Sequence, residues 1–295
     1  MATGFLQYLS DPARRPPPVW STLALFAGFY VLLLAAIMLA GMAALQLNPA
    51  ATGSLDVQTP LNQLLILAFG FGAPLAALLI WRRAGERRPI LSLIRVAGRW
   101  RPGLGLAAFG LMVVFVTGAV AVVMPGGPQA WLRADLGGTE GGRVGALMLA
   151  LLGVGFCIQV GFEELLCRGW LVQRVGWHGS GWLVAGAASA ALFTAMHAST
   201  SIEPAELARV FILGAAFVHA VARTGGLEAA FGAHLGNNLT IGIVLSPAMA
   251  GVEMPSAALE LGLPLLQGLL LVGLVELWLR LFPDGPPEPA KPERG

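Results

Sequence analysis

Charged residues are scarce in this chain: they make up 12% of its 295 residues, whereas soluble globular domains carry about 25%. Hydrophobic residues account for 56% of the sequence. Together these values exclude a soluble globular domain and predict an integral membrane protein that crosses the bilayer several times. The net charge is only +2, and no basic stretch is interleaved with aromatic residues, so we expect no nucleic-acid partner.

Cysteine is equally rare, with two residues in the whole chain. Cys157 and Cys167 lie ten residues apart on one predicted helix, which corresponds to about 15 Å of helical rise. That separation excludes a disulfide between them. Neither cysteine has the spacing of a metal ligand, and we interpret both as small, buried apolar residues.

Apolar windows of about 20 residues predict eight transmembrane helices. They cover residues 22–46, 61–81, 103–124, 144–173, 181–198, 205–223, 226–246 and 261–282. The first window is longer than the apolar region of a cleaved signal peptide, so it is interpreted as a retained span. The sequence thus predicts an all-α, polytopic membrane helical bundle, with residues 1–282 as a single transmembrane domain. The Pro-rich, polar residues 283–295 are expected to form a disordered cytoplasmic tail.

The distribution of lysine and arginine predicts the orientation of the spans, because cytoplasmic loops carry an excess of basic residues. Placing the N-terminus in the cytoplasm leaves only Arg133, Arg143 and Arg209 on the opposite side. The fifteen basic residues on the cytoplasmic side are Arg14, Arg15, Arg82, Arg83, Arg87, Arg88, Arg95, Arg99, Arg101, Arg168, Arg174, Arg223, Arg280, Lys291 and Arg294. We therefore expect a protein of a bacterial-type plasma membrane with both termini in the cytoplasm.

Small residues indicate which helices lie at the centre, because close backbone approach drives helix packing in lipid. The fifth and seventh spans are rich in Ala and Gly, whereas the eighth span and the first half of the first are dominated by Leu. The fourth to seventh spans are expected to form a central four-helix catalytic core, about 144–246, while the first and eighth spans face lipid. No internal repeat is evident, which argues against an inverted-repeat transporter.

The most informative charges are Glu163 and Glu164, which follow an apolar segment long enough to enter a membrane. An ionisable group inside the bilayer costs about 2.5–3.5 kcal/mol on insertion scales, so it marks a functional site by default. Arg168 lies four residues after Glu164, the favourable spacing and orientation for an ion pair on a helix. We expect Arg168 to neutralise Glu164 and to leave Glu163 facing the histidines.

Two later spans supply polar groups that could complete a catalytic site. His197 lies four residues after Phe193, and His234 and Asn238 are four apart and share one helix face. Glu163 and His197 are each seventeen residues from Ser180, so an antiparallel hairpin would bring them level. A buried carboxylate can activate water as a general base, and an Asn amide donor to an oxyanion contributes about 2.7–4 kcal/mol.

This combination predicts an amide hydrolase without a covalent nucleophile, since Ser189, Thr194, Ser199 and Ser201 lie in no elbow motif. A zinc site remains open, with Glu163, His197 and His234 as its ligands if a metal is present. Two other classes also remain: a non-catalytic membrane immunity or scaffolding factor, and a proton-coupled transporter that uses the carboxylates as a relay.

The polar residues resemble the motifs of the CPBP family, also called the Abi or CAAX-protease-like family, which includes the type II CAAX prenyl endopeptidases. That family carries Glu-Glu-x-x-x-Arg, then Phe-x-x-x-His, then His-x-x-x-Asn or Asp. The matching segments are Glu163-Glu164-Leu165-Leu166-Cys167-Arg168, Phe193-Thr194-Ala195-Met196-His197 and His234-Leu235-Gly236-Asn237-Asn238. Each motif is short, but the three in order within apolar helices form a specific signal.

The resemblance implies an intramembrane endopeptidase that cleaves a membrane-associated, prenylated CAAX-type or other lipidated peptide, or a membrane protein, in the lipid bilayer. It implies catalytic roles for Glu163, Glu164, Arg168, His197, His234 and Asn238, with Glu163 activating water. Family members are often labelled metalloproteases, and a metal-independent, glutamate-dependent mechanism is the alternative. We favour the second mechanism, which requires no cofactor, and leave zinc open.

Overall fold

The computed structural model describes residues 17–47, 60–95, 99–123, 146–178, 181–198, 203–245 and 257–283. Every regular element within these ranges is helical, and one isolated β-bridge joins Arg95 to Gly226. Residues 284–295 of the predicted tail lie outside the described residues, as do the predicted positions of Arg14, Arg15, Arg133, Arg143, Lys291 and Arg294. The all-α membrane bundle expected from the sequence is confirmed.

The helical elements overlap the eight apolar windows, except for the short helix Leu91–Ile94. They are α2 (Val19–Leu47), α3 (Pro60–Leu65), η1 (Ile66–Gly70), α4 (Phe71–Ile80), η2 (Trp81–Gly85), α5 (Leu91–Ile94), α6 (Pro102–Val123), α8 (Ala146–Glu164), η3 (Leu165–Leu171), α9 (Val172–Gly176), α10 (Trp182–His197), α11 (Pro204–Thr224), α12 (Glu228–Leu239), η4 (Thr240–Leu245) and α14 (Ala257–Leu281). Among the described residues, six continuous helices are long and apolar enough to cross a membrane, and α10 is a shorter apolar helix. The number of eight spans therefore stays a prediction.

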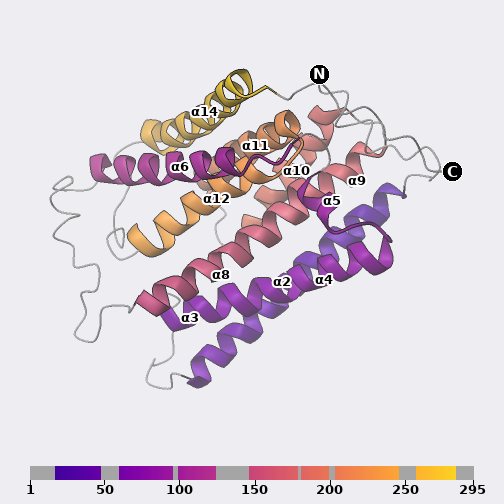
Figure 1. The fold of residues 1–295 in the computed structure, drawn as a ribbon. Helices are drawn as coiled ribbons and strands as arrows, with labels where there is room; N and C mark the ends of the chain where they lie inside the picture. Colours follow the sequence, from indigo (N-terminus) through magenta and orange to yellow (C-terminus); the bar gives the residue numbers. More distant parts are fainter. Residues whose placement is uncertain are drawn as a thin grey trace.

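The helices form layers that place the motif-bearing elements in the middle (Figure 1). On one side α14 and α6 pack on α11 and α12, and on the other side α2 packs on α4, which in turn packs on α8. Within the most apolar windows, 44% of residues are buried in Leu147–Gly176 and in Pro204–Thr224, but only 22% in Val19–Leu47 and 28% in Leu259–Leu281. The outer helices α2 and α14 are therefore less buried than the helices that carry the motifs, and their contact with lipid stays a prediction.

Glycine allows α6 and α12 to pack backbone against backbone. A Cβ added at Gly236 of α12 would lie 2.5 Å from the carbonyl oxygen of Phe109 in α6. Gly232 likewise faces the carbonyl of Gly105. This close approach supports the prediction that the Gly- and Ala-rich seventh span lies inside the bundle.

Four π-helical segments interrupt the long helices, and none of them was expected from the sequence. The segment η1 ends at Gly70, four residues before Pro74, whose nitrogen has no hydrogen to donate to the Gly70 carbonyl. The segment η3 begins directly after Glu164 and contains Arg168. Such segments are frequent at functional sites, and η3 lies within the Glu-Glu-x-x-x-Arg motif.

Both cysteines are free, which agrees with the exclusion of a disulfide between them. Cys167 is fully buried, as expected, but the interpretation of Cys157 as a buried residue is wrong because its side chain is exposed. Cys157 lies on the surface of α8 that faces away from the core.

Candidate active site

The centre of the bundle holds a fully buried ion pair between Glu164 and Arg168. Arg168 Nη1 lies 2.9 Å from Glu164 Oε1, and both side chains have no exposed surface. Glu164 is the last residue of α8 and Arg168 belongs to η3. The pair that the four-residue spacing predicts is therefore present, in a region where the desolvation of each charge must be compensated by its partner.

His234 of α12 lies between the two glutamates. Its Nδ1 is 2.8 Å from Glu164 Oε1, and its Nε2 is 3.3 Å from Glu163 Oε2. The expected division, in which Glu164 serves only Arg168 and Glu163 alone faces the histidines, is thus incomplete. Oε1 of Glu164 contacts both Arg168 and His234, because the Glu164 carboxylate lies between the guanidinium on η3 and the imidazole on α12.

Charge balance constrains the protons of this cluster. A carboxylate oxygen accepts hydrogen bonds, so the Nδ1 atom of His234 carries the hydrogen that it donates to Glu164. Arg168 balances one of the two buried carboxylates. The second is balanced when one further proton resides either on His234 Nε2 or on the carboxyl group of Glu163. These two atoms are therefore placed to exchange a proton.

Aromatic rings surround the cluster on the side of α10 and α11. The guanidinium carbon of Arg168 lies 4.1 Å from the ring centroid of Phe193 and 5.2 Å from that of Phe217. The His234 ring stacks on Phe217 with a centroid distance of 5.1 Å. Arg168 Nη2 also donates to the carbonyl of Gly214 at 3.4 Å. The rings exclude water from one side of the ion pair and fix the plane of the imidazole.

Gln159 is a site residue that the sequence reasoning missed. Its Nε2 donates to Glu163 Oε1 at 3.4 Å, and its side chain lines the cavity described below. The available signal was its position one helical turn before Glu163 on the same face of α8. An amide at this position holds one oxygen of Glu163 and leaves the other directed toward His234.

A cavity of about 260 Å³ adjoins the cluster and collects the remaining motif residues. Its walls include Gln159, His197, His234 and Asn238. Glu163 contacts two of these residues, Gln159 and His234. His197 is the last residue of α10. Residues of the second and third motifs thus line the cavity, and the first motif adjoins it through the contacts of Glu163.

Hydrogen bonds orient the polar ends that His197 and Asn238 present to this cavity. His197 Nδ1 donates to the carbonyl of Phe193 at 2.9 Å, which fixes the imidazole at the end of α10. Asn238 Oδ1 accepts from Asn237 Nδ2 at 3.0 Å, and Asn237 Oδ1 accepts from Gln267 of α14 at 3.0 Å. The amide nitrogen of Asn238 is thereby the end available as a donor.

The remaining candidate groups serve other purposes. Ser189 Oγ donates to the carbonyl of Cys167, and Thr194 Oγ1 donates to that of Ala190. Both hydroxyl groups are thus engaged with the backbone, whereas Ser199 and Ser201 lie outside the described residues. His219 lies 3.1 Å from Glu276 on the α11–α14 face, away from the cavity.

The zinc alternative requires three ligands close together, and the described part of the chain contains no such group of His, Cys, Asp or Glu side chains. His234 Nδ1 is already bonded to Glu164. The side chains described therefore do not form a three-ligand site as they stand, and the chemistry considered below is that of the protein's own residues.

Comparison with known proteins agrees with the motifs. The family model of the Rce1-like type II CAAX prenyl endopeptidases matches residues 144–240, about one third of the chain. No curated protein and no solved structure matches the chain. The matched range includes Glu163, Glu164, Arg168, His197 and His234 as well as Asn238, so the resemblance drawn from the motifs is confirmed over the helices that build the site. It supports an intramembrane protease of the CAAX type in an integral membrane protein.

Proposed function

We propose that this chain hydrolyses a peptide bond of a membrane-associated substrate by a glutamate-activated water molecule, without a required metal. The observation that carries the proposal is the position of His234, which is held by the buried Glu164 on one nitrogen and faces Glu163 with the other. A structural ion pair would need only Glu164 and Arg168. A second carboxylate and a histidine that can exchange a proton beside a cavity are the elements of general acid–base catalysis.

In the proposed mechanism, Glu163 removes a proton from a water molecule in the cavity as the water oxygen attacks the peptide carbonyl. Asn238 Nδ2 donates a hydrogen bond to the resulting oxyanion, and His197 lines the same cavity. The proton that Glu163 has taken from the water molecule passes through His234 Nε2 to the amine nitrogen as the carbon–nitrogen bond breaks. Glu164 and Arg168 fix the orientation of His234 throughout.

The test is hydrolysis by purified Glu163→Gln protein. This substitution keeps the size of the side chain and its contact with Gln159 but removes the base. The rate of cleavage of a prenylated CAAX-type peptide, the first substrate to assay, should fall about 10²- to 10⁴-fold. The thermal unfolding midpoint in detergent should change little.

The matched control is Glu276→Gln, the same change of carboxylate to amide on the α14 surface, where Glu276 pairs with Arg223. It should retain the wild-type rate. Wild-type cleavage by Glu163→Gln would contradict the proposal and favour the non-catalytic scaffolding alternative. Loss of cleavage in both variants would show that the assay reports on stability rather than on the proposed base.

A further inference from the structure

The cavity beside His234 lies in only one half of the bundle. Gln63 is in the first turn of α3, Glu206 and Arg209 are in the first two turns of α11, and Ile241 is in η4. His197 ends α10. Because neighbouring helices run antiparallel, these positions all fall toward the same end of the bundle.

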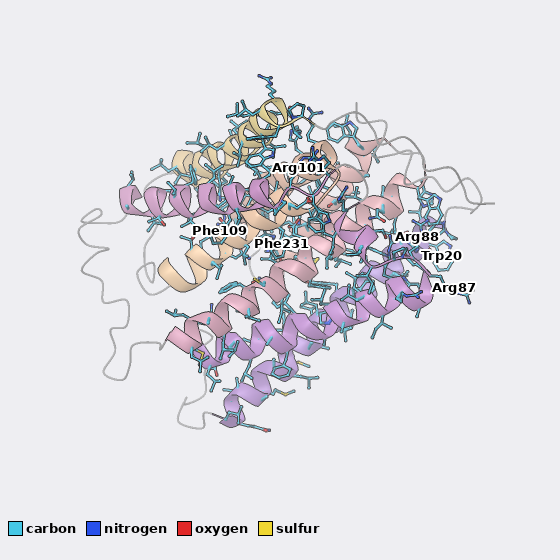
Figure 2. The ribbon with its side chains drawn as sticks, in the orientation of Figure 1. Trp20, Arg87, Arg88, Arg101, Phe109 and Phe231 are labelled. Carbon is cyan, nitrogen blue, oxygen red and sulfur yellow. The ribbon has the colours of Figure 1, made fainter. Side chains whose placement is uncertain are left out.

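Arginines define the other end. Figure 2 shows Arg87 and Arg88 together with Trp20 at the end where α2 begins and η2 finishes. Arg101 lies at the same end, because its Nη1 donates to the carbonyl of Thr224, the last residue of α11, at 2.8 Å. The other arginines at this end are Arg82, Arg83, Arg95, Arg99, Arg174, Arg223 and Arg280. Arg209 is the one described arginine at the cavity end, and it pairs with Glu206.

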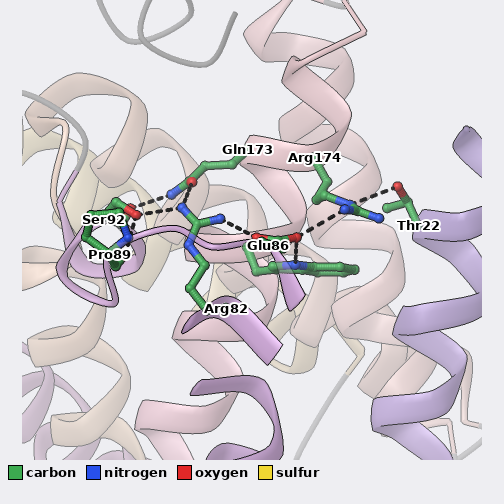
Figure 3. Close-up of polar contacts among 8 residues, drawn as sticks. Thr22, Arg82, Glu86, Pro89, Ser92, Gln173 and Arg174 are labelled. Carbon is green, nitrogen blue, oxygen red and sulfur yellow. Dashed lines mark hydrogen bonds and ion pairs between the residues drawn. The ribbon is translucent and has the colours of Figure 1, made fainter. Parts of the chain in front are cut away.

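A hydrogen-bond network joins Arg82, Glu86, Ser92, Gln173 and Arg174 at the arginine-rich end (Figure 3). Glu86 accepts from Arg82 Nη1 at 2.6 Å, from Trp170 Nε1 at 2.9 Å and from Arg174 Nη1 at 3.1 Å. Arg82 Nη2 also donates to Gln173 Oε1 at 2.7 Å. Arg82 donates to Glu86, Ser92 and Gln173 within this network. Buried charges that are paired in this way are costly to separate, so the network is a stable cover.

The backbone of residues 86–95 adds a second cover over the same end. The Leu227 amide donates to the Ile94 carbonyl at 2.9 Å and ties this segment to the turn after α11. A Cβ at Gly169 would lie 2.5 Å from the Leu93 carbonyl oxygen, so η3 rests directly on the segment. The η3 side chains between the cluster and this cover, among them Leu166 and Leu171, have no exposed surface.

Two further cavities lie toward the arginine-rich end, and neither is lined by a residue of the catalytic cluster. The first, of about 340 Å³, lies between Trp100, Arg101 and Trp278. The second has a volume of about 250 Å³. Its walls include Trp100, Gly161, Leu165 and Phe231. Gly161 and Leu165 are each two residues from Glu163, which places them about 200° away around the helix. This cavity therefore lies on the opposite side of α8 and offers no path to Glu163.

We infer that substrate reaches the site from the end opposite the arginines, which the excess of basic residues in cytoplasmic loops identifies as the non-cytoplasmic face. The substrate class is then a peptide segment of a membrane or exported protein on the non-cytoplasmic side of the bilayer. In cells, a prenylated tail in the cytoplasm would approach the closed end. In detergent both ends are accessible, so the prenylated peptide of the Glu163→Gln assay can still reach the cavity. Glu206 and Arg209, whose side chains are about one third exposed, place charged groups at the mouth that suit a polar peptide chain. The inference rests on the proposed function for the nature of the substrate, but its geometry can be tested separately.

The test is labelling of single cysteines by a membrane-impermeant maleimide in bacterial cells that express the full chain. The background carries Cys157→Ser and Cys167→Ala. Arg209→Cys and Ile241→Cys report on the cavity, and Arg87→Cys reports on the arginine-rich end. Both cavity positions should be labelled in intact cells, whereas Arg87→Cys should be labelled only after permeabilisation.

Each other pattern overturns the inference. Labelling of all three positions in intact cells would place the cavity mouth and the arginines on one face. Labelling of Arg87→Cys alone in intact cells would reverse the assignment of the membrane face. Protection of both cavity positions even in permeabilised cells, in protein that still unfolds cooperatively, would show that the cavity is closed. Labelling does not depend on hydrolysis, so its result is independent of the Glu163→Gln assay.

Discussion

His234 Nδ1 and Glu164 Oε1 lie 2.8 Å apart although seventy residues separate them in the chain. The same carboxylate oxygen accepts from Arg168 at 2.9 Å. One buried oxygen thus ties α8, η3 and α12 together and fixes the imidazole against Glu163. The positioning of the histidine and the stability of the bundle therefore depend on the same contacts.

Arg168→Ala should destabilise the protein and abolish cleavage together. Removing the guanidinium leaves Glu164 buried without its cation, and breaking one side of a buried pair costs about 3–5 kcal/mol. The measurement is the thermal unfolding midpoint in detergent, with Arg280→Ala at the exposed end of α14 as the matched control. An unchanged midpoint for Arg168→Ala would mean that the ion pair is not part of the folded core.

Asn238→Ala should lower kcat about 10²- to 10³-fold with a smaller change in KM, because the donor acts on an oxyanion that is absent from the bound substrate. Steady-state cleavage of the peptide substrate measures both constants. Gln46→Ala removes an exposed amide from α2 and should leave both unchanged. A rise in KM with constant kcat would instead assign Asn238 to substrate binding.

Gly236→Ala should weaken the protein because its Cβ would lie 2.5 Å from the Phe109 carbonyl and 3.1 Å from the Met112 Cβ. Overpacking of this kind costs about 1–3 kcal/mol, and moving α12 from α6 would also displace His234. The control is Gly118→Ala, where an added Cβ meets nothing within 4 Å. Unfolding midpoints that fall equally for the two variants would argue against a specific α6–α12 contact.

Treatment with a chelator should leave the cleavage rate unchanged, because the proposed base and proton donors are Glu163 and His234 rather than a metal-bound water. The assay compares the purified protein before and after dialysis against 1,10-phenanthroline, alongside metal analysis of the same samples. Loss of activity that zinc restores would contradict the metal-independent mechanism and require His234 and Glu163 to move toward a third ligand.

The sequence by itself determined the membrane class, the positions of the apolar helices and the three motifs, because bilayer thickness sets the length of a span and buried charges are too costly to occur by accident. It also predicted the Glu164–Arg168 pair, since residues four apart on one helix are neighbours wherever the helix lies.

Only the tertiary structure decided how these helices meet. The bond between His234 and Glu164 and the bond between Gln267 and Asn237 join different helices, so they depend on how those helices cross. The end at which the cavity opens depends likewise on contacts between distant segments, such as the packing of the Leu93 carbonyl against Gly169. Such contacts arise from backbone packing across the bundle, for which a single sequence carries no local signal.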